Sequence, residues 1–225
     1  MRYFKITNFL LLILFSSFLY AEEKNDRENL YQIKLIMFSH DLSNYIDYDE
    51  NYINDKFENI NSVEIKKNNC LINNDNDCIK YDYDYKLENF NDYKDKLIKN
   101  DEIKVLSHLE WIQNINSKNI IKIKSGYDYS QEIIDEKILI NDIDILSSGK
   151  ISKYEGYVSV TKKKFYEINI TLYERKKMKP PGFFSEEFLT SKKYHLFQKI
   201  KLNKIYYIDR DNFGILISLN KIPNN

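Results

Sequence analysis

The sequence predicts an α+β fold, predominantly an antiparallel β-sheet with one or two helices. Apolar and aromatic segments separated by short polar turns fill the second half of the chain, which is typical of consecutive antiparallel strands. The composition includes 19 Tyr and 13 Phe, which favour strands, but only 5 Gly and 3 Pro. Apolar side chains recur at roughly helical spacing over residues 86–99, which predicts a helix there.

The first 21 residues are typical of a secretory signal peptide. Arg2 and Lys5 precede an apolar run at residues 9–15, and small residues lead to Ala21 and a charged segment. The apolar run is shorter than the roughly 20 residues that a membrane-spanning helix needs. We therefore expect cleavage after Ala21 and a periplasmic mature protein. A retained leader that anchors the protein is the alternative.

Residues 22–225 predict a single domain, because no linker rich in Pro, Gly or Ser divides them. The 34 basic and 34 acidic residues cancel, so the net charge gives no argument for a nucleic acid or an anionic membrane. A membrane is expected as a partner only if the leader stays uncleaved.

The first elements of the mature chain are a strand, a loop and a helix. Residues 31–38 alternate and then become mostly apolar, as in a buried strand. Residues 39–84 are acidic, rich in Asn and poor in periodicity, which predicts a long loop. The helix of residues 86–99 follows.

Residues 103–113 are better explained as a strand, although a helix stays open. The apolar face of this strand would carry Ile103, Val105, Leu109 and Trp111. Trp111, the single tryptophan, is then expected in the core, and the alternative is a sugar platform. His108 falls on the opposite face, where a structural hydrogen bond is the expected role.

The second half is almost entirely strand-like. The predicted strands are residues 137–140, 143–146, 154–160, 165–173, 194–202, 205–209 and 213–219. Lys162, Lys163 and Lys164 occupy the tip of one predicted hairpin, and residues 203–204 form the turn of another. The basic stretch 174–182 predicts a mobile charged loop, with contact to anionic wall polymers or lipid headgroups as the alternative.

Cys70 and Cys78 bracket a polar, turn-prone segment. In an oxidising compartment such a pair predicts a disulfide that closes a short loop, worth about 2–3 kcal/mol. Two free thiols are the alternative. A metal site is not expected, because the 3 histidines are scattered without ligand spacing.

Three segments carry a resemblance to a known family. They are residues 31–38 after the leader, residues 105–113 with their Leu, His, Trp and Gln, and residues 205–217 with Tyr, Asp and then Phe-Gly. A weaker match begins at Gly156 and continues at residues 165–166. In these segments the chain resembles the CsiV family, periplasmic peptidoglycan-binding proteins of gammaproteobacteria linked to cell-shape integrity.

The chain also departs from the family pattern. Arg210-Asp211 stands where the family favours His-Pro, and Gln198-Lys199-Ile200-Lys201 stands where it has a run of arginines. Exchange of Arg for Lys keeps the charge but loses the two-pronged donor that grips carboxylates. The resemblance therefore argues more strongly for a shared fold than for shared binding residues.

The resemblance implies binding to peptidoglycan and support of a peptidoglycan synthase or its activator, without catalysis and without a cofactor. Glycan rings stack on aromatic faces, and stem-peptide carboxylates accept hydrogen bonds from Lys and Arg. The hairpin around residues 203–204 offers both kinds of group, on Lys201, Lys204, Tyr206, Tyr207 and Arg210. For each of them, a core tyrosine or a solvated lysine is the alternative.

The sequence contains no motif of the G-x-S-x-G or H-E-x-x-H type. Asp75 and Asp77 begin like a calcium loop that the following residues do not continue. Glu110 and Asp209 are a conceivable glycosidase pair, but 34 acidic residues make some pair expected by chance. We therefore predict a non-enzymatic protein. The alternatives are a wall-cleaving hydrolase of unfamiliar type and an interaction module held at the inner membrane by an uncut leader.

Overall fold

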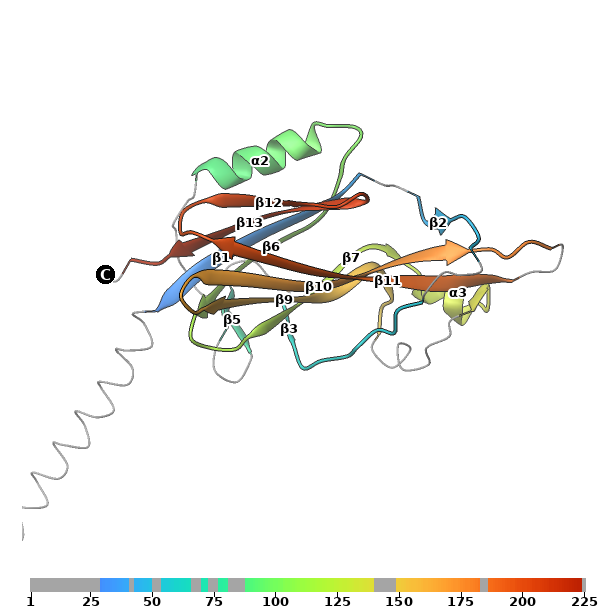
Figure 1. Cartoon of the computed structure of the whole chain (residues 1–225), viewed down its shortest axis with the longest axis horizontal. Helices are drawn as coiled ribbons and strands as arrows, with labels where there is room; N and C mark the ends of the chain where they lie inside the picture. Colours follow the sequence, from blue (N-terminus) through green and yellow to red (C-terminus); the bar gives the residue numbers. More distant parts are fainter. Residues whose placement is uncertain are drawn as a thin grey trace, which may run out of the picture.

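Two β-sheets pack face to face in the computed structural model of the chain (Figure 1). The structure describes residues 29–40, 43–49, 54–65, 70–72, 77–80, 88–139, 149–182 and 186–223. Within these residues most strand pairs are antiparallel and two helices accompany them, which confirms the predicted α+β class. The predicted leader and its cleavage site, and the apolar run at 143–146, lie outside the described residues.

The first sheet has six strands in the order β12-β13-β1-β6-β4-β5. Their bounds are β1 Leu30–Ser39, β4 Cys70–Ile72, β5 Cys78–Lys80, β6 Lys104–Asn114, β12 Ile205–Asp209 and β13 Phe213–Lys221. Strand β1 is the centre of this sheet, since β13 and β6 both pair with it in antiparallel register over nearly its whole length. The predicted strands at 31–38, 103–113 and 213–219 are confirmed.

The second sheet has seven strands, with β3-β7-β9-β10-β11-β8 in order and β2 paired to the far end of β10. Their bounds are β2 Tyr45–Ile46, β3 Val63–Glu64, β7 Ile120–Asp128, β8 Ile138–Leu139, β9 Ser152–Lys162, β10 Tyr166–Met178 and β11 Glu187–Ile200. Helix α3 (Ser130–Ile134) lies between β7 and β8. The β9–β10 hairpin with its lysine tip is confirmed.

The main core lies between the two sheets. Strand β1 contributes Ile33, Leu35 and Met37, and these pack against apolar residues from β7, β9 and β10 of the second sheet. Trp111 is completely buried in this core, and its indole Nε1 donates a hydrogen bond to Oε1 of Gln113 at 2.8 Å. The prediction that the tryptophan is a core residue is therefore confirmed.

A bulge in β6 divides its apolar residues between the two faces. Ser107 pairs with Met37 but Val105 pairs with Phe38, so Leu106 is the extra residue. A bulge reverses the alternation of side chains that follow it. The expectation that Val105 shares a face with Trp111 is therefore wrong, because Val105 packs on the outer face beneath α2.

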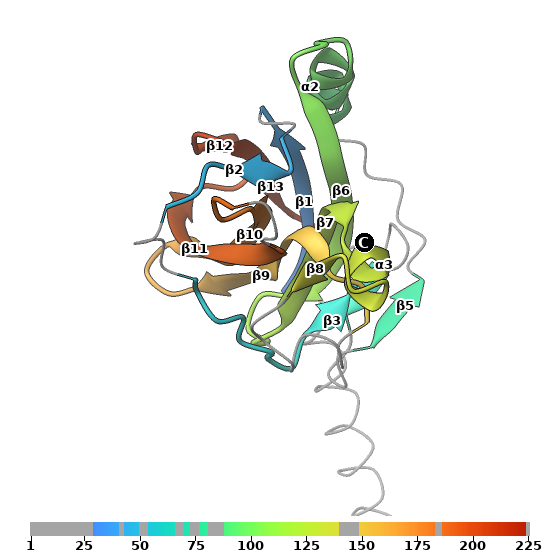
Figure 2. The same ribbon diagram turned by 90° about the vertical axis from the view of Figure 1, so that its right-hand side faces the viewer.

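Helix α2 (Glu88–Ile98) covers part of the outer face of the six-stranded sheet (Figures 1 and 2). Phe90 is fully buried against Ile36 and Phe38, and this contact fixes the helix to β1. The helix predicted over residues 86–99 is confirmed. Neither helix in the described part of the chain combines the length and the apolar character needed to cross a bilayer.

The stretch 39–84 is not a loop throughout. Strands β2, β3, β4 and β5 all lie within it, each two or three residues long, and each joins the edge or end of a sheet. Phe57 is buried there in a second cluster on the outer face of the seven-stranded sheet. Such short strands form because longer neighbours offer free edges, which periodicity in a single sequence does not reveal. Cys70 and Cys78 are joined by a disulfide across β4 and β5.

The prediction that the strands on either side of residues 203–204 pair as a hairpin is wrong. Strand β11 belongs to the seven-stranded sheet, whereas β12 pairs with β13 in the other sheet. Asn203 has a φ of 56°, and its backbone N–H donates to the Leu219 carbonyl at 2.9 Å. A short turn fixes where the chain reverses, but the packing of the sheets decides which strand becomes the partner.

The basic stretch predicted as a mobile loop is a strand over most of its length, because β10 continues to Met178. Arg175 is almost fully buried, and its Nη1 donates to Glu155 Oε2 at 2.9 Å. Lys122 and Lys124 also approach Glu155, at 3.2 and 3.5 Å. A run of charges in a sequence is typical of a solvated loop, whereas here Glu155 on β9 and Glu132 in α3 pair with Arg175 and Lys177.

Candidate functional site

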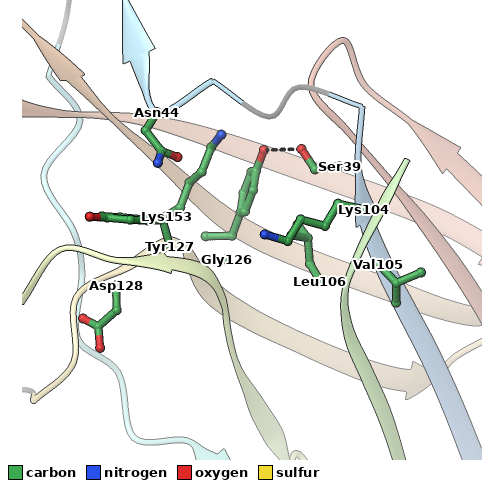
Figure 3. Close-up of a pocket in the computed structure, with 10 residues that line it drawn as sticks. Ser39, Asn44, Lys104, Val105, Leu106, Gly126, Tyr127, Asp128 and Lys153 are labelled. Carbon is green, nitrogen blue, oxygen red and sulfur yellow. Dashed lines mark hydrogen bonds between the residues drawn. The ribbon is translucent and has the colours of Figure 1, made fainter. Parts of the chain in front are cut away.

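A cleft opens at the end of the molecule where β1 finishes. Its volume is about 460 Å³, within the usual range for small-molecule sites. Strands from both sheets form its walls, together with the segment that leads into β2 (Figure 3). The polar and aromatic residues among those that line it are Ser39, Asn44, Lys104, Tyr127, Asp128, Lys153 and Tyr154.

The back wall of the cleft is tied down by a buried carboxylate. Tyr154 donates from its hydroxyl to Glu174 Oε1 at 3.1 Å, and the same hydroxyl lies 3.4 Å from Ser39 Oγ. Glu174 Oε2 accepts two more hydrogen bonds, from Tyr194 at 3.0 Å and from Asn212 at 2.7 Å. Glu174 therefore holds strands of both sheets together and is fully engaged in structural contacts.

Asp128 is engaged as well. It accepts hydrogen bonds from the backbone N–H of Ser130 at 3.0 Å and from the Ser130 hydroxyl at 2.6 Å, at the start of α3. Partial burial works to raise the pKa of Asp128, but these bonds and the nearby Lys150 ammonium outweigh it and hold the pKa below its usual value. The carboxylate is therefore charged at neutral pH and serves the turn into α3.

Two hydrogen-bond donors in the cleft are not occupied by side chains in this way. Within the described parts of the chain, no side chain forms an ion pair or a hydrogen bond with the Lys104 ammonium or the Asn44 carboxamide. Figure 3 shows Lys104 extending from β6 toward Lys153, with Asn44 at the opposite edge. The Lys153 ammonium already donates to the Ser43 carbonyl. Lys104 and Asn44 are thus the groups that remain available to a ligand.

A half-exposed tyrosine, Tyr127, lines the cleft, and a second one, Tyr45, directly follows the lining residue Asn44. Tyr45 is 49% exposed and Tyr127 is 43% exposed. The Lys177 ammonium lies 4.6 Å from the centre of the Tyr45 ring and donates to Glu132 Oε2 at 2.8 Å. The Tyr127 hydroxyl donates to the other oxygen of Glu132 at 2.5 Å. One ion pair therefore positions both rings.

The protonation states of this ion pair follow from its geometry. The hydrogen bonds from Lys177 and Tyr127 lower the pKa of Glu132. Burial alone would lower the pKa of Lys177, but the bond and the charge of Glu132 dominate and raise it. The hydrogen bond to Glu132 raises the pKa of Tyr127. At neutral pH the carboxylate and the ammonium are both charged, and the phenol is neutral.

The predicted site residues separate into two groups, and the first group adjoins the cleft. Tyr207 is 51% exposed, stacks on Phe38 at 6.0 Å between ring centres, and donates to Asp209 at 2.6 Å. Burial and this bond raise the pKa of Tyr207 to about 12. Arg210 follows in the turn, which touches the cleft because Ser39 Oγ donates to the Asn212 carbonyl at 3.0 Å.

The second group lies at the opposite end of β12. Tyr206 points into the main core, and its hydroxyl accepts from the Lys201 backbone N–H at 2.9 Å. Lys204 precedes the strand and is exposed. Arg210 is six positions after Lys204, which is about 20 Å along an extended strand. The structure therefore does not bring the five predicted residues together into one site.

The conceivable acidic pair is not a pair. Glu110 accepts from Gln32 at 2.5 Å and lies 3.3 Å from the Lys34 ammonium, on β6. Asp209 lies on β12, three strand spacings away, which is about 14 Å and beyond the separation of glycosidase carboxylates. No group of His, Cys, Asp and Glu in the described residues has the arrangement of a metal site.

Sequence reasoning missed the four residues that give the cleft its character. Asn44 and Tyr45 lie in the segment expected to be a loop, and Lys104 is one lysine among many. The exposure of Tyr127 could have been predicted from the sequence, since this residue follows Gly126 and precedes an Asp-x-Ser turn. Gly126 has a φ of 86°, which ends the regular pairing of β7 and exposes the next side chain.

Comparison with known proteins gives one finding. The family model described as peptidoglycan-binding protein, CsiV, matches residues 7–222, nearly the whole chain. No curated protein and no solved structure gives a significant match. The chain belongs to the CsiV family.

Proposed function

We propose that this protein is a non-enzymatic peptidoglycan-binding protein of the periplasm that supports cell-wall synthesis and cell shape. Membership of the CsiV family supports the binding of peptidoglycan. The signal-peptide character of residues 1–21 supports export to the compartment in which peptidoglycan lies. A peptidoglycan synthase or its activator is the proposed protein partner.

The observation that carries the proposal is the cleft, with Tyr127 in its lining and Tyr45 near Tyr127. Tyr45 and Tyr127 present half-exposed ring faces beside the opening, and the ion pair between Lys177 and Glu132 holds both rings in place. Rings held in place lose little conformational freedom when a ligand stacks on them. A sugar ring offers the flat apolar face that such a stack needs.

The interior of the cleft suits the second component of peptidoglycan. Stem peptides carry carboxylates, and a carboxylate accepts hydrogen bonds from both an ammonium and an amide. Lys104 and Asn44 provide these two donors from opposite walls. Tyr207 and Arg210 extend the proposed surface past Ser39 along the edge of the six-stranded sheet.

Sedimentation with purified sacculi tests the proposal. We expect the exported protein to co-sediment without releasing soluble muropeptides, and we expect K104A/Y127A to bind about tenfold or more weakly, because one charged hydrogen bond and one stacking face are lost. The matched control is Y93A/K96A, since Tyr93 is 44% exposed on α2 with the Lys96 ammonium 5.5 Å from its ring centre.

The outcomes are distinct. Equal losses for the cleft variant and the α2 control would show that the cleft is not the binding site. Release of muropeptides by the wild-type protein, and not by a preparation from cells that lack it, would instead establish a wall-cleaving hydrolase. Absence of co-sedimentation would leave a protein-interaction module.

A further inference from the structure

The end of the molecule opposite the cleft is strongly basic. It consists of the β9–β10 turn and the corner between β11 and β12, here called the basic end. Residues 161–167 and 197–204 contain six lysines that are all exposed: Lys162, Lys163, Lys164, Lys199, Lys201 and Lys204. Their single acidic residue is Glu167, which pairs with Lys163 at 2.9 Å. A protein with no net charge therefore carries a concentrated positive surface at one end.

Two exposed phenylalanines lie among these lysines. Phe165 is 49% exposed and Phe197 is 55% exposed. The Lys199 ammonium lies 5.3 Å from the centre of the Phe165 ring, and the Lys164 ammonium lies 5.8 Å from it. Phe197 and Lys199 are two residues apart on β11 and so project from the same face. Apolar rings and ammonium groups thus form one continuous surface.

The chain enters the folded structure at this same end. The Tyr31 hydroxyl lies 3.0 Å from the Tyr166 hydroxyl, which places the start of β1 beside the β9–β10 turn. Figure 1 shows the start of β1 and this turn on the left, and β2 and α3, which flank the cleft, on the right. Strand β1 has 10 residues, so the basic end and the cleft lie about 30 Å apart.

We propose that the basic end docks on the anionic phospholipid surface of the membrane. Lysines are attracted to an anionic leaflet within about one Debye length, roughly 8 Å at physiological salt. Exposed aromatic rings between them can insert at the level of the headgroups. The leader supports this partner over the wall polymer, because before its cleavage it holds the chain at the membrane, and Leu19 is only 11 residues before Leu30 and thus within about 40 Å of this end.

Docking in this orientation points the cleft away from the membrane. If the proposed wall binding holds, the cleft then faces the peptidoglycan while the opposite end rests on lipid. The docking itself does not depend on what the cleft binds, so the two proposals are tested separately.

Flotation with lipid vesicles tests the docking. The full chain is mixed with vesicles of equal parts phosphatidylglycerol and phosphatidylcholine, and with vesicles of phosphatidylcholine alone. We expect the lipid concentration at half-saturation to be at least tenfold lower for the anionic vesicles, and salt to weaken the binding. The leader carries Arg2 and Lys5 and itself favours anionic lipid, so the charge variants of the basic end, which leave the leader unchanged, assign the difference between the two lipids.

Matched charge variants locate the surface. K162Q/K164Q/K199Q removes three charges from the basic end without touching the Lys163–Glu167 pair, and should raise the half-saturating concentration of anionic lipid about tenfold or more. K137Q/K150Q/K179Q removes three exposed charges near the cleft and should change it less than twofold. F165S/F197S should weaken binding while the dependence on salt persists. Thermal unfolding verifies that each variant is folded.

Three results would overturn the proposal. The first is equal binding of the wild-type chain to anionic and neutral vesicles. The second is an equal loss for the two lysine variants, which indicates non-specific charge attraction. The third is a basic-end variant that keeps vesicle binding but loses sacculus sedimentation, which assigns this surface to the wall.

Discussion

At the scale of single residues, burial affects the pKa and the hydrogen bonding of a polar side chain, as His108 shows. His108 stacks on Phe90, with ring centres 6.2 Å apart, on the face of β6 opposite Trp111. Its Nε2 is buried and has no hydrogen-bond partner among the described residues, so the expected structural hydrogen bond is absent there at this atom. Burial, aided by the charge of Lys94, lowers the pKa of His108.

This lowered pKa predicts a loss of stability in mild acid. The unfolded chain binds the proton more readily than the folded chain, so the stability that His108 contributes is complete above about pH 6.5 and is lost as the pH falls through the folded-state pKa. We expect the free energy of unfolding in denaturant to decrease between about pH 7.5 and pH 5. H108Q should remove this part of the decrease, and an unchanged pH dependence in H108Q would contradict the prediction.

At the scale of elements, close approach between strands sets the geometry of the second sheet. Gly156 lies on β9 between Ile123 of β7 and Leu172 of β10. A Cβ atom at this position would lie 2.1 Å from the Thr171 carbonyl oxygen and 2.8 Å from the Leu172 Cα. Both contacts are with backbone, so a larger residue must move the strands apart.

We expect G156A to lower the free energy of unfolding by about 3 kcal/mol, because backbone cannot give way as a flexible side chain can. S159A, on the same strand and only partly buried, is the control and should change it by less than about 0.5 kcal/mol. Urea unfolding of both variants measures the difference. Similar values for the two would mean that β9 and β10 tolerate a wider spacing.

Comparison of the elements shows which signals in a sequence are sufficient. Strand β1 was predictable because it is buried along its whole length and is mostly apolar, and helix α2 because its apolar residues recur at helical spacing. Strands of two or three residues, such as β2 and β3, have no period to detect. The basic stretch that begins at Glu174 was wrongly predicted to be a loop, because the acidic partner of Arg175, Glu155, belongs to the neighbouring strand.

At the scale of the whole molecule, two surfaces of different chemistry lie at opposite ends. The cleft end holds the tyrosines and the ion pair of Lys177 and Glu132, and the basic end holds six exposed lysines. Sites this far apart that share no partner residues contribute independently to binding. The sum of charges, which is zero, hides this separation completely.

Independence of the two ends is itself testable. The fold-loss in sacculus binding caused by K104A/Y127A should be the same in the wild-type background and in the K162Q/K164Q/K199Q background, within about twofold. Sedimentation of the four proteins completes the cycle. A cleft effect that disappears in the second background would mean that one ligand spans both ends.

The sequence by itself determined the α+β class, the central strands, the helix of residues 86–99 and the burial of Trp111, because each depends on a local period or on the size of one apolar side chain. Only the tertiary structure decided which sheet β12 joins, which face Val105 occupies, and that Tyr127 stands beside Tyr45. These facts depend on contacts between segments far apart in the chain. Local sequence carries no record of such contacts, since the partner that makes a group buried, paired or exposed belongs to another strand.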